Sequence, residues 1–203
     1  MATKDVPDHP STDLLLHLGR WIPLVFLTTT VICGFMLGNY NHLSRMVSDL
    51  GAIGTPSRFY FSAGLLACSV MSALFIVGLC RVCAALRISR LPALLLLAYT
   101  ISIAGAGVFP LPLRMHLLMG MPSVLLILSP LLSLALWRGR SRLPGIEGAS
   151  MACLVVMALG FLAFLRGVLP DLVGLKQRFF HLGWCMWFLY LSYRFARVNS
   201  GLA

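Results

Sequence analysis

Residues 59–80 read FYFSAGLLACSVMSALFIVGLC, an uncharged apolar stretch with Arg58 before it and Arg81 after it. A membrane-spanning helix needs about 20 mostly apolar residues, and this stretch meets that requirement. Its apolar residues do not alternate with a period of two, as those of a membrane barrel strand would. The segment therefore predicts a helix that crosses a membrane.

Five further stretches have a similar length and composition. The six predicted spans are Trp21–Gly38, Phe59–Cys80, Leu91–Val108, Leu117–Trp137, Met151–Val168 and Phe179–Phe195. Pro110 and Pro112 end the third, because proline lacks the N–H group that a continuing helix needs, and Pro122 and Pro130 predict a bend in the fourth. We expect an all-α polytopic membrane bundle of six transmembrane helices over residues 21–196, with tails at 1–20 and 197–203.

The composition excludes several classes of protein. Of the 203 residues, 59% are hydrophobic and 11% are charged, and the mean hydropathy is +0.91. Soluble domains carry about 25% charged residues and about 45–50% apolar ones. A soluble enzyme, a disordered segment and a disulfide scaffold are therefore excluded.

The distribution of Lys and Arg predicts the orientation, because cytoplasmic loops carry an excess of both. Ten lie on the side of the termini: Lys4, Arg20, Arg81, Arg87, Arg90, Arg138, Arg140, Arg142, Arg194 and Arg197. Six lie on the other side: Arg45, Arg58, Arg114, Arg166, Lys176 and Arg178. Both termini are expected in the cytoplasm. The net charge of +10 then reflects topology and gives no reason to expect a nucleic-acid partner.

The predicted outer loops contain unusual polar residues. His42, His116 and His181 all fall at the outer membrane boundary, while His9 and His17 lie in the N-terminal tail. Ionisable groups near lipid are costly unless they pair or line a wet cavity, so their clustering suggests a functional site. The candidate catalytic residues are His42, Ser48, Asp49, His116 and His181.

The same side is predicted to attract anions. The second, fourth and sixth helices begin there, and helix N-termini carry partial positive charge. Beside them stand Arg45, Arg58, Arg114, Lys176 and Arg178. Gln177 and Arg178 precede His181 by four and three residues, which places them on neighbouring faces of one turn. We expect Arg58, Arg114, Gln177 and Arg178 to bind a ligand; alternatively, the charged groups reach lipid head groups or pair with Asp49 and Asp171.

Two cofactors are compatible with the histidines. His42, His116 and His181, together with Asp49, have the composition of a zinc site that could activate water, although no HExxH spacing is present. Two of the outer histidines could instead be axial ligands of a haem. Nothing in their spacing selects either cofactor.

Three motifs resemble a bacterial membrane family known only as domain of unknown function 998. The motifs are residues 41–44 with 47–52 and 54–56, residues 107–110 with His116, and residues 174–178. The first also resembles, more loosely, the loop after the first helix in the Frag1/DRAM/Sfk1 group, although Ser57-Arg58 replaces the acidic residue that follows the proline there. These resemblances imply a multi-pass protein of the bacterial inner membrane with an outward-facing site for lipid.

We therefore expect a protein that binds, and could modify, a lipid head group or similar amphiphile at the outer leaflet. The alternative is a non-enzymatic transport or assembly subunit whose polar loops contact a membrane-protein partner.

Overall fold

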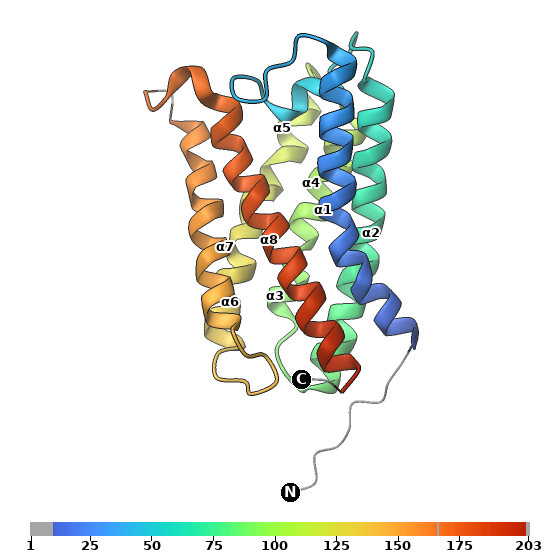
Figure 1. Ribbon diagram of the computed structural model, residues 1–203, viewed down its shortest axis with the longest axis vertical. Coiled ribbons are helices and arrows are strands. Elements are labelled where there is room, and N and C mark those ends of the chain that lie inside the picture. Colours follow the sequence, from blue (N-terminus) through green and yellow to red (C-terminus); the bar gives the residue numbers. More distant parts are fainter. Residues whose placement is uncertain (1–9, 166, 202–203) are drawn as a thin grey trace, which may run out of the picture.

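The computed structural model describes residues 10–165 and 167–201 (Figure 1). These residues form a bundle of helices and contain no strand. The first helix starts and the last helix ends at the same end of the bundle, here called the terminal end; the opposite end is the distal end. Lys4, His9 and Arg166, which entered the sequence-based predictions, lie outside the described residues.

The chain alternates long helices with short 3₁₀ segments. In order, these are α1 (Pro10–Leu37), η1 (Val47–Gly51), α2 (Arg58–Ala85), α3 (Leu91–Leu94), α4 (Leu97–Val108), α5 (Arg114–Gly120), η2 (Met121–Ile127), α6 (Leu128–Leu136), α7 (Ile146–Gly160), η3 (Phe161–Phe164), η4 (Pro170–Leu172) and α8 (Val173–Asn199).

Among the described residues, five helical stretches are long and apolar enough to cross a membrane: Ser11–Leu37, Arg58–Ala85, Leu91–Val108, Arg114–Leu136 and Ile146–Phe164. They correspond to five of the six predicted spans. The all-α class and the membrane character of the chain are thus confirmed. The sixth predicted span lies inside α8, which is long enough to cross a membrane but more polar, and it is not one of these five.

Several predicted boundaries differ from the structure, and the start of the first span and the end of the fifth differ most. α1 begins at Pro10, inside the predicted tail, because the leucine-rich segment before Trp21 continues the helix; Asp13 and His17 form an i,i+4 pair there at 2.9 Å. α7 runs from Ile146 only to Gly160 and continues as η3, short of the predicted end at Val168. Pro122 stands in the first turn of η2, where the helix of the fourth predicted span changes to 3₁₀ geometry.

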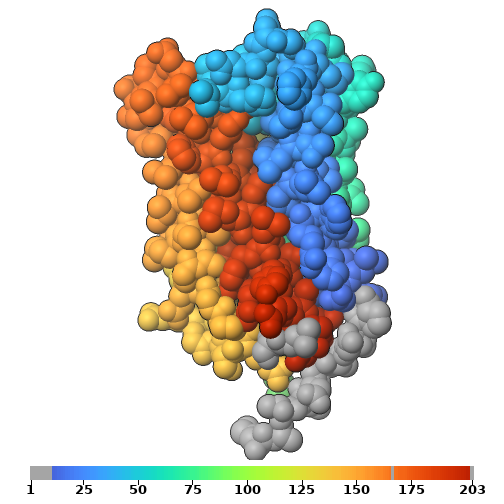
Figure 2. Space-filling view, in the orientation of Figure 1, coloured from blue at the N-terminus to red at the C-terminus, as the bar shows by residue number. Residues whose placement is uncertain are grey.

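α8 lies between α1 and α7 and covers one face of the bundle (Figure 2). Trp184 on α8 is buried among aromatic rings, with centroid distances of 4.5 Å to Tyr99, 5.1 Å to Phe26 and 5.6 Å to Phe188. Aromatic pairs at such distances add stability beyond the area that they bury. This cluster joins α1, α4 and α8 below a cavity in the distal half of the bundle.

Candidate functional site

The cavity has a volume of about 350 Å³. Small-molecule sites commonly measure about 300–1,000 Å³, whereas one water occupies about 30 Å³ in the liquid. Its lining is mostly apolar and comes from α1, η1, α2, α4, α5, η2, η3 and α8, among other segments. A cavity of this size and lining suits an organic ligand.

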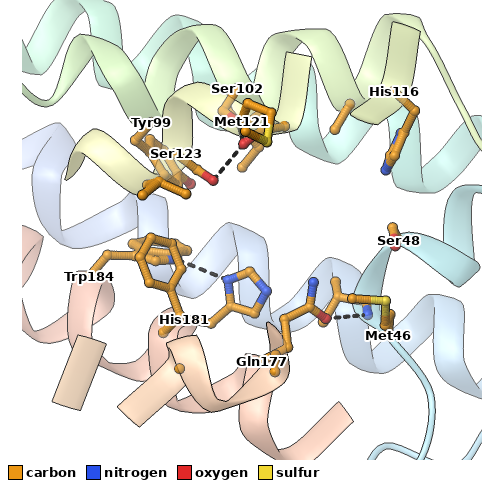
Figure 3. Close-up of a pocket in the computed structure, with 18 of the residues that line it drawn as sticks. Met46, Ser48, Tyr99, Ser102, His116, Met121, Ser123, Gln177, His181 and Trp184 are labelled. Atoms are coloured by element: carbon orange, nitrogen blue, oxygen red, sulfur yellow. Dashed lines mark hydrogen bonds between the residues drawn. The ribbon is translucent and has the colours of Figure 1, made fainter. Parts of the chain in front are cut away.

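Figure 3 shows how the polar lining residues are arranged. Trp184 and Tyr99 lie at the deep end, and Ser48 and His116 lie at the distal end. Gln177 and His181 project from α8, opposite Ser102 and Ser123. The cavity therefore has aromatic rings at one end and hydrogen-bonding groups along two of its sides.

The distal end is closed by residues 38–57, here called the roof loop, of which Met46, Val47 and Ser48 line the cavity. The loop is joined to the start of α8 by one hydrogen bond to a side chain and one between backbone groups. The Val47 N–H donates to Gln177 Oε1 at 2.8 Å, and the Leu175 N–H donates to the Leu43 carbonyl at 2.8 Å. Asp49 caps η1 within the loop, since its Oδ2 accepts from the Met46 N–H at 3.2 Å and lies 3.4 Å from Arg45 Nε.

Arg178 is the side chain that makes the most hydrogen bonds between α8 and the roof loop. Its Nη1 donates to the carbonyls of Arg45 (3.1 Å) and Gly174 (2.9 Å). Its Nη2 donates to the Tyr40 hydroxyl and to His42 Nδ1, both at 2.9 Å. The guanidinium that the sequence assigns to anion binding is thus occupied by protein acceptors.

His42 belongs to this fastening and does not line the cavity. Burial and the neighbouring Arg178 charge hold the pKa of His42 below its ordinary value of 6.5. An Arg N–H can only donate, so the bond from Arg178 requires an unprotonated Nδ1. The loop is therefore built around a neutral imidazole.

This neutral imidazole predicts a pH dependence of stability. The unfolded chain protonates His42 near its ordinary pKa, whereas the folded chain resists protonation, so the stabilisation is complete above about pH 6.5 and is lost as the pH falls below it. The melting temperature of the wild type should fall relative to that of His42→Gln between pH 7.5 and pH 5. If the melting temperatures of the wild type and of His42→Gln change equally with pH over this range, this role of His42 is wrong.

The other predicted cationic residues lie outside the cavity lining. Arg58 stacks on the Phe59 ring at 5.4 Å, and Arg114 is exposed at the start of α5. Lys176 is buried, with its Nζ donating to the carbonyls of Leu165 (3.2 Å) and Val168 (2.6 Å). Of the cationic residues predicted to attract anions, Lys176 and Arg178 instead hold chain segments together at the distal end.

Four of the predicted site residues do meet at the cavity: Ser48, His116, Gln177 and His181. His116 Nδ1 lies 2.8 Å from the Phe109 carbonyl, which can only accept, so Nδ1 carries the proton. His181 Nδ1 accepts from the Trp184 indole at 3.0 Å. Two segments far apart in the sequence thus present imidazoles to one cavity.

The proposed metal set does not assemble in the part of the chain that is described. No group of three or more His, Cys, Asp or Glu residues there is placed to hold a metal ion. The physical reason is that His42, His116 and His181 are directed to different partners: Arg178, the Phe109 carbonyl and Trp184.

Several lining residues are not predicted from the sequence, because they lie inside the predicted spans. Tyr99, Ser102, Ser123 and Trp184 are polar or amphipathic residues within apolar helices. Ser102 Oγ donates to the carbonyls of Met119 and Gly120 at 2.8 Å, which ties α4 to α5. The polar residues within the third and fourth predicted spans are the sequence signal that could have identified this side of the cavity.

Comparison with known proteins places the chain in a family. Neither the curated proteins nor the solved structures include a match to it. The family model described as protein of unknown function (DUF998) matches residues 22–194, which contain the whole cavity lining. The chain belongs to this DUF998 family, as its three motifs predict.

Proposed function

We propose that this protein binds an amphiphile, such as a membrane lipid, in the cavity beneath the roof loop. The observation that carries the proposal is a mostly apolar space of about 350 Å³ with Ser48, His116, Gln177 and His181 at its edges. An apolar pocket with a few convergent polar groups is the usual form of a small-molecule site. If a reaction follows binding, Ser48 and His116 are the groups available at the distal end.

The proposal includes six membrane spans, with α8 as the sixth. At about 1.5 Å per residue, the 27 residues of α8 exceed the roughly 30 Å of a bilayer's hydrocarbon core. Lys176 and Arg178 lie near one end of α8, and Arg194 and Arg197 near the other. The residues between these pairs include no Asp, Glu, Lys or Arg, and their one ionisable imidazole is that of His181. A span formed by α8 therefore places no charged Lys, Arg, Asp or Glu side chain at the bilayer centre.

With six spans, the excess of Lys and Arg on the terminal side favours both termini in the cytoplasm. The cavity would then lie in the outer half of a bacterial plasma membrane, as the family resemblance implies. A lipid of the outer leaflet is the ligand best placed to reach it.

Native mass spectrometry of the protein purified in a mild detergent tests this function. The wild type should retain an amphiphile. Ala106→Phe, which places a ring in the cavity from α4, should lose it. Ala67→Phe is the matched control, because Ala67 is exposed on α2 outside the cavity lining. A wild type without bound amphiphile, or equal retention by Ala106→Phe, would contradict the proposal.

A further inference from the structure

The side chains of Gln177 and His181 define the chemical class of the ligand, an inference that rests on the proposed function. We infer that the cavity takes an uncharged lipid whose carbonyl oxygen, as in an acyl ester, accepts hydrogen bonds from both residues. The hydrocarbon chain of the lipid would fill the remaining apolar volume.

The first donor follows from the tautomer of His181. The Trp184 indole nitrogen can only donate, and it does so to His181 Nδ1 at 3.0 Å. Nδ1 is therefore unprotonated, and the ring proton is on Nε2. Within the described part of the chain, Nε2 is buried and has no hydrogen-bond partner. In Figure 3, Nε2 lies on the side of the ring that faces Gln177. A buried N–H without an acceptor is costly, so an acceptor is expected beside it.

The second donor follows from the orientation of the Gln177 amide. The Val47 N–H at 2.8 Å requires that the oxygen of Gln177, rather than its nitrogen, faces the roof loop. The amide nitrogen therefore points the other way, and Figure 3 shows it directed into the cavity. Gln177 and His181 are one helical turn apart on the same face of α8. Two N–H donors so placed can converge on one oxygen.

The charge of the lining excludes an anionic group from this position. Of the described residues that line the cavity, none is Arg, Lys, Asp or Glu. The nearest guanidinium on α8, that of Arg178, is occupied by Arg45, Gly174, Tyr40 and His42. A phosphate or carboxylate inside would therefore lose its hydration without gaining a counter-charge. An uncharged ester loses much less hydration free energy when it enters the cavity.

The outer rim of the cavity identifies the source of the ligand. Three residues that line the cavity are also largely exposed on the surface of the bundle: Leu117 (70%), Met121 (65%) and Phe164 (70%). They belong to α5, η2 and η3, within stretches apolar enough to cross a membrane, so these segments form both a wall of the cavity and part of the outer surface of the bundle. A wall of apolar side chains with one side toward the bilayer suits entry of a hydrocarbon chain from the membrane.

Binding of two matched lipids tests the inference. Mono-oleoylglycerol carries an ester carbonyl, and 1-O-oleylglycerol has the same chain and head group with an ether in its place. The wild type in detergent should bind the ester about tenfold more tightly, since two hydrogen bonds of ordinary strength amount to about that factor. His181→Phe, which leaves only the Gln177 donor, should reduce the preference to about threefold, while His181→Gln, which keeps an N–H donor, should restore part of it. Oleate, whose carboxylate is charged, should bind more weakly than the ester.

The outcomes separate this inference from the proposed function. If ester and ether bind equally and Ala106→Phe excludes both, the cavity is a lipid site but the two donors do not select its ligand. If oleate binds more tightly than the ester and Ala106→Phe excludes it, the uncharged class is wrong. If neither lipid binds the wild type, or Ala106→Phe binds them as well as the wild type, the proposed function fails and this inference fails with it.

Discussion

Arg178→Met is expected to lower the free energy of unfolding by about 2–4 kcal/mol, because hydrogen bonds to charged groups contribute about 1.5–3 kcal/mol each but are not additive. The substitution removes all four bonds from the guanidinium to the roof loop and α8. It also leaves the carbonyl of Arg45 and the hydroxyl of Tyr40 without this donor, and a buried acceptor that loses its partner adds to the cost.

The effect can be measured by titration with SDS in mixed micelles, or as the melting temperature in detergent. Arg114→Met is the control, because Arg114 is exposed and surface substitutions usually change stability by less than about 0.5 kcal/mol. Arg178→Lys should recover only part of the loss, since an ammonium lacks the planar fork that reaches four acceptors. Equal stability of the Arg178→Met and Arg114→Met proteins would show that Arg178 does not fasten the loop.

Gly160→Ala is expected to destabilise the protein by about 2–3 kcal/mol. A Cβ at residue 160 would lie 2.6 Å from the Phe180 backbone nitrogen and 2.8 Å from its Cα. Backbone atoms cannot turn aside as a side chain can, so α7 and α8 would have to separate. Overfilling a packed site typically costs about 1–3 kcal/mol, and small residues are what allow membrane helices to approach this closely.

The same helix offers the matched control for Gly160. Gly148 also lies on α7, but nothing is within 4 Å of the position that its Cβ would take. Gly148→Ala should leave stability unchanged or raise it slightly, since alanine favours a helix over glycine by up to about 1 kcal/mol. If both variants melt at the wild-type temperature, the close approach of α7 and α8 is not a constraint on the fold.

Much of the fold can be predicted from the sequence because membrane spans are set by length and apolarity. The uncharged run at residues 59–80 alone identifies α2. Helix ends are less predictable, since they depend on partners elsewhere in the chain. After η3, the carbonyls of Leu165 and Val168 accept hydrogen bonds from Lys176, which lies eleven and eight positions further along the chain. Lys176 read alone is a surface cation, and nothing in its local sequence predicts that it is buried.

The site is predictable as a region but less so in its chemistry. Four predicted residues, Ser48, His116, Gln177 and His181, do line one cavity. His42 and Arg178 were grouped with them because they are polar and lie at the same end of the bundle. Their mutual hydrogen bond at 2.9 Å joins residues 136 positions apart, and no local pattern contains it. Polarity in the sequence marks both the groups that face a ligand and the groups that hold a loop.

The most direct test of the central claim, that a lipid occupies the cavity, is photolabelling in bilayers with an ester lipid that carries a diazirine in its chain. Adducts are mapped by mass spectrometry of peptides. We predict adducts on interior lining residues such as Ile103, Val124 and Phe161, which disappear with excess unlabelled mono-oleoylglycerol and in Ala106→Phe. Adducts confined to the exposed faces of the helices, such as Val70 and Val77 on α2, and unchanged by the competitor and by Ala106→Phe, would contradict it.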